Sequence, residues 1–136
     1  MVKRILTLLV ALCLIMSVAA VASAGKLDEI KERGKLIVGV KDAVVPFGFV
    51  DENTNQLVGF DIDICRYIAE QLGVDIEILP VTSATRIPMV AQGQVDLVAA
   101  TMTHKFERDD VIDFSITYFM DGQKILVAKD SGITSA

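Results

Sequence analysis

The stretch that decides the fold runs from residue 34 to residue 40 and reads Gly34-Lys35-Leu36-Ile37-Val38-Gly39-Val40. Its nearly continuous apolar run is typical of a buried strand. Gly34 also ends a short helix predicted over residues 26–33, because glycine is the preferred residue just beyond a helix end. This part of the sequence thus predicts a short helix followed by a buried strand.

The same alternation continues toward the C-terminus. A helix is predicted over residues 61–72, where Ile64, Ile68 and Leu72 recur at spacing four as its buried stripe. The turn residues at 51–55 predict a hairpin-like excursion before this helix. The further predicted elements are strands at 74–81, 95–100, 116–119 and 124–129 and a helix at 86–92. This order predicts an α/β fold with a mostly parallel sheet flanked by helices.

The N-terminus has the three parts of a secretory signal peptide. Lys3 and Arg4 precede an apolar run over residues 5–22, and the small residues Ala22-Ser23-Ala24 follow it. Cleavage after Ala24 would leave residues 25–136 as one small domain in the periplasm or secreted from the cell. The alternative is an uncleaved anchor helix, because about 18 apolar residues lie at the lower edge of what spans a bilayer.

Composition excludes several classes of function. The net charge of the whole chain is −5, and it becomes −7 once the two cations of the signal segment are removed. An acidic chain lacks the basic face that binding to nucleic acid requires. With Cys13 in the signal segment, Cys65 has no partner for a disulfide. A single histidine is too little for a zinc site of the usual kind, and we expect neither a metal nor a cofactor.

Polar side chains gather where the predicted parallel strands end, which is where such sheets bind ligands. They follow three strands in turn: Lys41, Asp42, Phe47 and Phe49; then Thr82, Ser83, Thr85 and Arg86; then Thr101, Thr103 and Arg108. No pair of a nucleophile and a base stands out among them, so we expect a binding site without catalytic residues.

Four segments together resemble the N-terminal lobe of extracellular solute-binding proteins of polar amino-acid ABC transporters, of the family 3 type. They are residues 34–40, residues 46–49 (Pro-Phe-Gly-Phe), residues 58–63 (Val-Gly-Phe-Asp-Ile-Asp) and residues 93–115, which include Gly93-Gln94-Val95-Asp96-Leu97. The resemblance implies one lobe of a periplasmic-binding-protein-like fold of type II, whose two lobes close on a ligand. The chain would correspond to about the first half of a member and end near the hinge strand.

The resemblance also implies roles for individual residues. Arg108 matches the arginine that holds the α-carboxylate of the ligand, a role that suits the planar fork of a guanidinium. Thr101 and Thr103 match the loop that completes this recognition, and Phe47 or Phe49 would supply an apolar wall. The alternatives are a surface Arg108 that pairs with neighbouring carboxylates, and core packing for one of the two phenylalanines.

The segment from Thr82 to Pro88 is similar to that of members that bind glutamate and aspartate. There an arginine at the position of Arg86 reaches the side-chain carboxylate of the ligand, and Lys41 matches a second basic position. Asp42 would face the ammonium group. The resemblance therefore favours an acidic amino acid over a polar uncharged one. The alternative for Arg86 is an exposed position in the first turn of its helix.

Other charged or reactive residues have simpler interpretations. Asp61 is expected to cap the start of the helix at 61–72. Asp96 is expected to stabilise a turn or the lobe, His104 to lie at the surface, and Cys65 to be a core thiol.

The expected function is to bind glutamate or aspartate outside the cytoplasm and deliver it to an ABC-transporter permease. The alternatives are a sensor-type ligand-binding domain, a truncated inactive fragment, and a dehydratase-like enzyme on the same fold. An incomplete lobe would expose apolar surface and sheet edges, so self-association through that surface is a further expectation.

Overall fold

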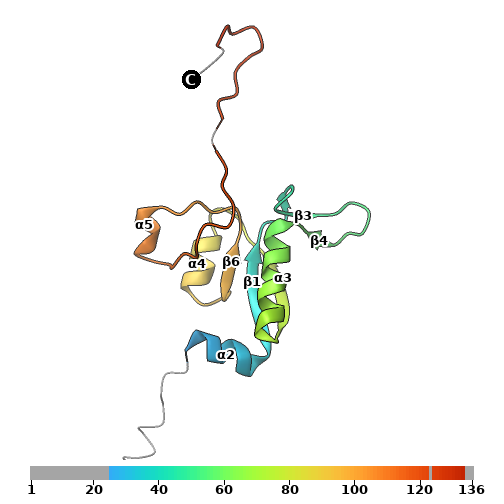
Figure 1. The fold of residues 1–136 in the computed structure, drawn as a ribbon, viewed down its shortest axis with the longest axis vertical. Coiled ribbons are helices and arrows are strands. Elements are labelled where there is room, and N and C mark those ends of the chain that lie inside the picture. Colours follow the sequence, from blue (N-terminus) through green and yellow to red (C-terminus); the bar gives the residue numbers. More distant parts are fainter. Residues whose placement is uncertain (1–24, 123, 134–136) are drawn as a thin grey trace, which may run out of the picture.

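The first strand, β1 (Lys35–Val40), is the centre of a three-stranded parallel sheet (Figure 1). The computed structural model describes residues 25–122 and 124–133. β5 (Asp75–Pro80) pairs with one side of β1, with Lys35 opposite Asp75, and β6 (Leu97–Ala99) pairs with the other side. Every second side chain of β1 is buried, as the apolar run predicts. The predicted parallel sheet is therefore confirmed, whereas the predicted signal peptide lies outside the described residues.

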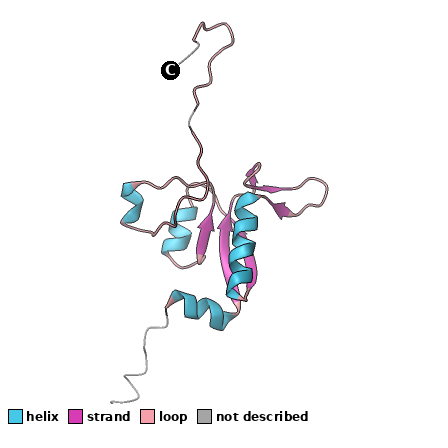
Figure 2. Cartoon of the chain, viewed as in Figure 1, coloured by secondary structure: helices cyan, strands magenta, loops and turns pink. Residues whose placement is uncertain are grey.

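Four helices accompany the sheet in the described part of the chain: α2 (Lys26–Arg33), α3 (Phe60–Leu72), α4 (Arg86–Ala91) and α5 (Phe106–Asp109) (Figure 2). α3 packs against β1 and β5. It buries Ile62, Cys65 and Ala69, whereas the predicted stripe of residues 64, 68 and 72 is only half-buried. The helix is therefore rotated by about one residue from the predicted orientation, because residues 62, 65 and 69 also follow helical spacing.

A small antiparallel sheet leads into α3. It consists of β2 (Ala43–Val44), β3 (Gly48–Val50) and β4 (Leu57–Val58), in that order. The turn between β3 and β4 is closed by the Asp51 carboxylate, which accepts hydrogen bonds from the N–H groups of Asn53 at 3.0 Å and Thr54 at 2.8 Å. Short acidic and amide side chains stabilise turns in this way, and the predicted hairpin is confirmed.

The predictions of strands at 116–119 and 124–129 are wrong for the described residues. The chain beyond α5 is irregular there, and its last part extends away from the body of the molecule (Figure 1). Ile125 and Leu126 are largely exposed. An apolar sequence becomes a strand only when a neighbouring strand pairs with it, and no described residue supplies this pairing. Among the described helices, none has the length and apolar character to cross a membrane.

Cys65 is fully buried in the core cluster, as predicted. Burial raises the pKa of its thiol to about 12 from 9.0, and at pH 8 this leaves about a thousandfold less of the reactive thiolate than a free cysteine has. In the chain of residues 25–136, where Cys65 is the only cysteine, we expect reaction with a disulfide reagent to be at least a hundredfold slower than in urea. Fast labelling of the folded chain would contradict this burial.

Candidate functional site

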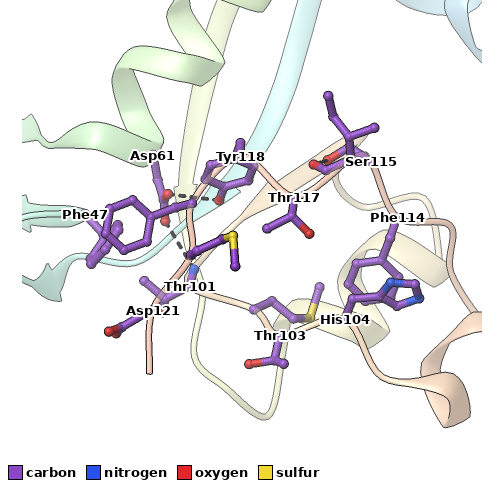
Figure 3. Close-up of a pocket in the computed structure, with 14 residues that line it drawn as sticks. Phe47, Asp61, Thr101, Thr103, His104, Phe114, Ser115, Thr117, Tyr118 and Asp121 are labelled. Carbon is purple, nitrogen blue, oxygen red and sulfur yellow. Dashed lines mark hydrogen bonds between the residues drawn. The ribbon is translucent and has the colours of Figure 1, made fainter. Parts of the chain in front are cut away.

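A cavity of about 410 Å³ opens beyond the carboxyl ends of the strands (Figure 3). Its walls come from Phe47, Asp61, the loop of residues 101–104 and the segment of residues 114–121. Hydroxyls of threonine, serine and tyrosine are mixed with aromatic rings and two methionines in this lining. The cavity therefore lies where the sequence predicts ligand binding, and it offers both hydrogen-bonding and apolar contacts.

Thr101 occupies the middle of this site and has an unusual backbone. Its φ is +49°, in the left-handed region that residues with a β-carbon rarely adopt. Its N–H donates to Oδ2 of Asp61 at 3.1 Å, and its carbonyl accepts a hydrogen bond from Nη1 of Arg86 at 3.2 Å. The predicted site residues Thr101 and Thr103 both line the cavity.

Asp61 does not have the capping role that the sequence predicts. Gly59 is the N-cap of α3, and Asp61 lies in the first turn with its side chain fully buried. Its carboxylate reaches into the site instead, where Oδ1 accepts the hydroxyl of Tyr118 at 2.9 Å (Figure 3). Burial raises the pKa of Asp61, although both hydrogen bonds oppose this shift. Burial, together with the Asp61 charge, also raises the pKa of Tyr118.

Phe47 forms an aromatic wall of the cavity, one of the two possibilities that the sequence left open. Its ring meets Phe119 edge to face with centroids 4.8 Å apart, and Phe60 lies next to both rings. The carbonyl of Phe47 also accepts the N–H of Asp61 at 2.9 Å, which joins the wall to the start of α3. Phe49 lies in β3, half-buried and outside the lining.

Arg86 lies behind the loop and is almost completely buried, with 8% of its surface exposed. Its Nη1 donates to the carbonyl of Ala100 at 2.6 Å as well as to that of Thr101. Its Nε has no hydrogen-bond partner among the described residues. Burial, and then the charge of Arg108, lower the pKa of Arg86. The alternative interpretation of Arg86 as an exposed helix residue is therefore wrong, while its predicted contact with a ligand stays a prediction.

The other predicted cations lie outside the lining of the cavity. Nη1 of Arg108 donates to the carbonyl of Thr103 at 2.5 Å, so its guanidinium is attached to the same loop. Nζ of Lys41 donates to the hydroxyl of Ser83 at 2.9 Å, and Asp42 is exposed nearby. The structure thus brings Phe47, Thr101 and Thr103 into one cavity, and it leaves the predicted charged residues outside the lining: Lys41, Asp42, Arg86 and Arg108.

Sequence reasoning missed several residues of the site. Asp61 and Tyr118 were not among the predicted site residues, although the Gly-Phe-Asp segment around residue 60 was singled out. His104 was expected at the surface. It is exposed, and it also lines the cavity, where its ring stacks on Phe114 with centroids 4.6 Å apart and Nε2 lies 2.7 Å from Asp109.

Comparison with known proteins identifies the family of the chain. Residues 36–134 match the family described as bacterial extracellular solute-binding proteins, family 3. The glutamine-binding protein of Geobacillus stearothermophilus is 48% identical over 117 residues, which cover 84% of this chain and 45% of the relative. The chain thus spans less than half the length of this relative, whose name is that of a binding protein rather than an enzyme.

Two solved structures are similar to the fold. The arginine-bound form of domain 1 from TmArgBP, the T. maritima ArgBP, is 43% identical with a TM-score of 0.65, covering 68% of this chain and 72% of that one. The ancestral amino acid-binding protein AncCDT-1, a precursor of cyclohexadienyl dehydratase, is 44% identical with a TM-score of 0.73, covering 79% and 47%. The chain belongs to the bacterial extracellular solute-binding proteins of family 3, of which it contains part of one type II lobe.

Proposed function

We propose that this chain binds a polar amino acid outside the cytoplasm and delivers it to an ABC importer. The observation that carries the proposal is the pair of threonines, Thr101 and Thr103, that face the cavity on the loop to which Arg108 is attached. Among the described residues, only one nitrogen of the Arg108 guanidinium makes a hydrogen bond. The remaining N–H groups are free to bind a carboxylate, and the threonine hydroxyls can complete its hydrogen bonds.

Glutamine is the ligand that we favour. The relative that is 48% identical is named for it, and the Arg86 guanidinium is already engaged with backbone carbonyls. A neutral amide side chain needs no cation from the site.

Glutamate or aspartate, which the sequence favours, is the second candidate. Nζ of Lys41 contacts only the hydroxyl of Ser83 among the described residues, and no described carboxylate neutralises it. If a ligand extends to this ammonium, which has no counter-charge among the described residues, an acidic side chain would be favoured. The two candidates therefore differ in whether Lys41 takes part in binding.

Thermal unfolding of residues 25–136 with excess L-glutamine, L-glutamate or L-aspartate tests the proposal. A ligand that binds only the folded chain stabilises it, by about 2.7 kcal/mol at a hundred times the dissociation constant. We expect glutamine to raise the midpoint most and Arg108→Gln to abolish the shift for every ligand, because the fork for the α-carboxylate is lost. That domain 1 of TmArgBP has an arginine-bound form supports the use of a single lobe.

Three results separate the alternatives. If glutamate alone shifts the midpoint and Lys41→Met removes this shift, the acidic ligand replaces glutamine. If Arg108→Gln responds to glutamine as the unchanged chain does, Arg108 is a surface arginine. No shift with any of these amino acids would reject the proposed function.

The proposal includes export and two kinds of partner. The basic start, the apolar run and the Ala-x-Ala site of residues 1–24 support a cleaved signal peptide and a periplasmic or secreted location. The matched family is described as extracellular, which supports the same location. The partners are the amino acid and a membrane permease. Self-association through the exposed apolar residues around Ile125 remains part of the proposal.

A further inference from the structure

Two buried residues of opposite charge meet at one peptide bond. The carbonyl of Ala100 accepts a hydrogen bond from Nη1 of Arg86 at 2.6 Å. The N–H of the same peptide group, which belongs to Thr101, donates to Oδ2 of Asp61 at 3.1 Å. Because the oxygen and the hydrogen of a trans peptide point in opposite directions, the guanidinium and the carboxylate approach this peptide from its two sides.

The two charges have no other charged partner in the part of the chain that the structure describes. Neither Asp61 nor Arg86 takes part in a described ion pair, although Asp61 is fully buried and only 8% of Arg86 is exposed. An unpaired charge is unfavourable in a protein interior. Here the dipole of the Ala100–Thr101 peptide lies between the two charges, with its oxygen toward the cation and its hydrogen toward the anion, so it stabilises both.

This arrangement fixes a backbone conformation that Thr101 would otherwise avoid. The orientation of the Ala100–Thr101 peptide plane sets φ of Thr101, which is +49°. A left-handed conformation is unfavourable for threonine, whose β-carbon is branched. A second hydrogen bond from Arg86, to the carbonyl of Thr101, holds the following peptide as well. With both peptides fixed, Thr101 stays in the lining of the cavity.

We propose that Asp61 and Arg86 are positioning residues for ligand binding: they hold the Ala100–Thr101 peptide between opposite charges and thereby keep Thr101 directed at the cavity. This inference rests on the proposed function. It assigns to Arg86 a role that differs from the predicted contact with an acidic ligand, because Arg86 here acts through Thr101. Loss of the Arg86 side chain should therefore lower the binding affinity for every amino acid by the same factor, whatever the side chain of that amino acid.

The binding experiment uses Asp61→Asn and Arg86→Met in residues 25–136, with titration calorimetry of L-glutamine and L-glutamate. We expect each variant to weaken both ligands at least tenfold and by equal factors. Asp96→Asn is the matched control, because Asp96 is another buried carboxylate that accepts a backbone N–H, from Ile37 at 2.8 Å, and it lies outside the lining of the cavity; it should change affinity less than threefold. If Arg86→Met weakens glutamate strongly and glutamine little, Arg86 reads the ligand side chain and the inference is overturned.

Amide hydrogen exchange tests the same inference without any ligand. In the unchanged chain the Thr101 amide should exchange at least a hundredfold more slowly than the amide of its exposed neighbour Thr103. Asp61→Asn and Arg86→Met should accelerate exchange at Thr101 at least tenfold, while the buried strand amide of Val38 keeps its rate. Rapid exchange at Thr101 in the unchanged chain overturns the inference, even if no amino acid binds and the proposed function fails.

The NMR spectra that follow hydrogen exchange also show whether each variant is folded. A single substitution leaves one buried charge without its opposite, whereas the double variant Asp61→Asn with Arg86→Met removes both. We therefore expect the double variant to lose less unfolding free energy than the sum of the two single losses, because the effects of interacting residues are not additive. Strictly additive losses would mean that the two charges act independently, which contradicts the shared peptide.

Discussion

Replacing Gly59 with alanine should destabilise the folded chain by about 3 kcal/mol, roughly the sum of a backbone strain and a steric overlap. Gly59 is the N-cap of α3 and has φ of +134°, a value that only glycine adopts readily. A β-carbon at this position would overlap the carbonyl oxygen of Phe47 and come within 2.8 Å of the carbonyl oxygen of Pro46. Both obstacles are backbone atoms, so no side chain can rotate away.

The backbone cannot retreat without further loss. The two carbonyls that a β-carbon would meet accept the first N–H groups of α3, from Phe60 at 3.0 Å and from Asp61 at 2.9 Å. Moving the loop of residues 46–47 would break these bonds and displace Phe47 from the cavity. We therefore expect Gly59→Ala to reduce ligand affinity together with stability.

Gly73→Ala is the matched control for this prediction. Gly73 ends the same helix with φ of +69°, and no atom lies within 4 Å of the position of its β-carbon. In Gly73→Ala only the strain of a left-handed backbone remains, which lowers the free energy of unfolding by about 1 kcal/mol. Urea unfolding of both variants, followed by circular dichroism, measures the difference. If the two variants lose the same stability, the close approach at Gly59 does not contribute.

Replacing Asp96 with alanine should cost about 2–3 kcal/mol of unfolding free energy, mainly because the half-buried N–H of Ile37 loses its acceptor. Only 1% of the Asp96 side chain is exposed. Its Oδ2 accepts the N–H of Ile37 at 2.8 Å and also contacts the guanidinium of Arg33. Its Oδ1 lies 3.3 Å from Nζ of Lys26. The one carboxylate thereby attaches α2 to the start of β6 and to β1.

Most of the stability lost on replacing Asp96 should come from the hydrogen bond of Ile37, and less from the ion pairs with Arg33 and Lys26. The side chains of Arg33 and Lys26 are 36% and 49% exposed, so water can solvate their charges when the Asp96 carboxylate is removed. Asp96→Asn keeps an acceptor for Ile37 and should lose only about 1 kcal/mol. Glu77→Gln, which breaks an exposed ion pair with Lys35, should lose less than about 0.5 kcal/mol. If Asp96→Asn is as unstable as Asp96→Ala, the stabilisation comes from the charge of Asp96 rather than from its hydrogen bond to Ile37.

The core of the fold could be predicted because its signals are local. The apolar run of β1, the glycine that ends α2, and the turn at Asp51 each specify a structure within a few residues. Their order then leaves few arrangements other than a parallel sheet. The lobe-stabilising role of Asp96 also followed from its place beside a strand, although the sequence could not identify its partners 59 and 63 residues away.

The errors arose where contacts distant in the sequence decide the outcome. Residues 116–119 have the composition of a strand, yet the Tyr118 hydroxyl donates a hydrogen bond to Asp61, 57 residues earlier, and no strand in the described residues pairs with this segment. Asp61 follows the pattern of a helix cap, but the backbone of Gly59 takes the N-cap position. Arg86 would be an exposed cation by its helix position alone. Its burial depends on the carbonyls of residues 100 and 101, which the sequence does not reveal.

The order of the strands has a consequence for how the chain emerges. β1 comes first in the sequence but takes the central place in the sheet, and its partners lie far behind it, with Lys35 paired to Asp75 and Val38 to Leu97. A chain that leaves a ribosome or a membrane channel N-terminus first therefore presents β1 without either neighbour. Because distant pairing delays folding, β1 and β5 cannot pair fully until residue 80 has emerged, and the three-stranded sheet is complete only after residue 99. This topology leaves the apolar strand β1 without a partner strand until more than half of the chain has emerged.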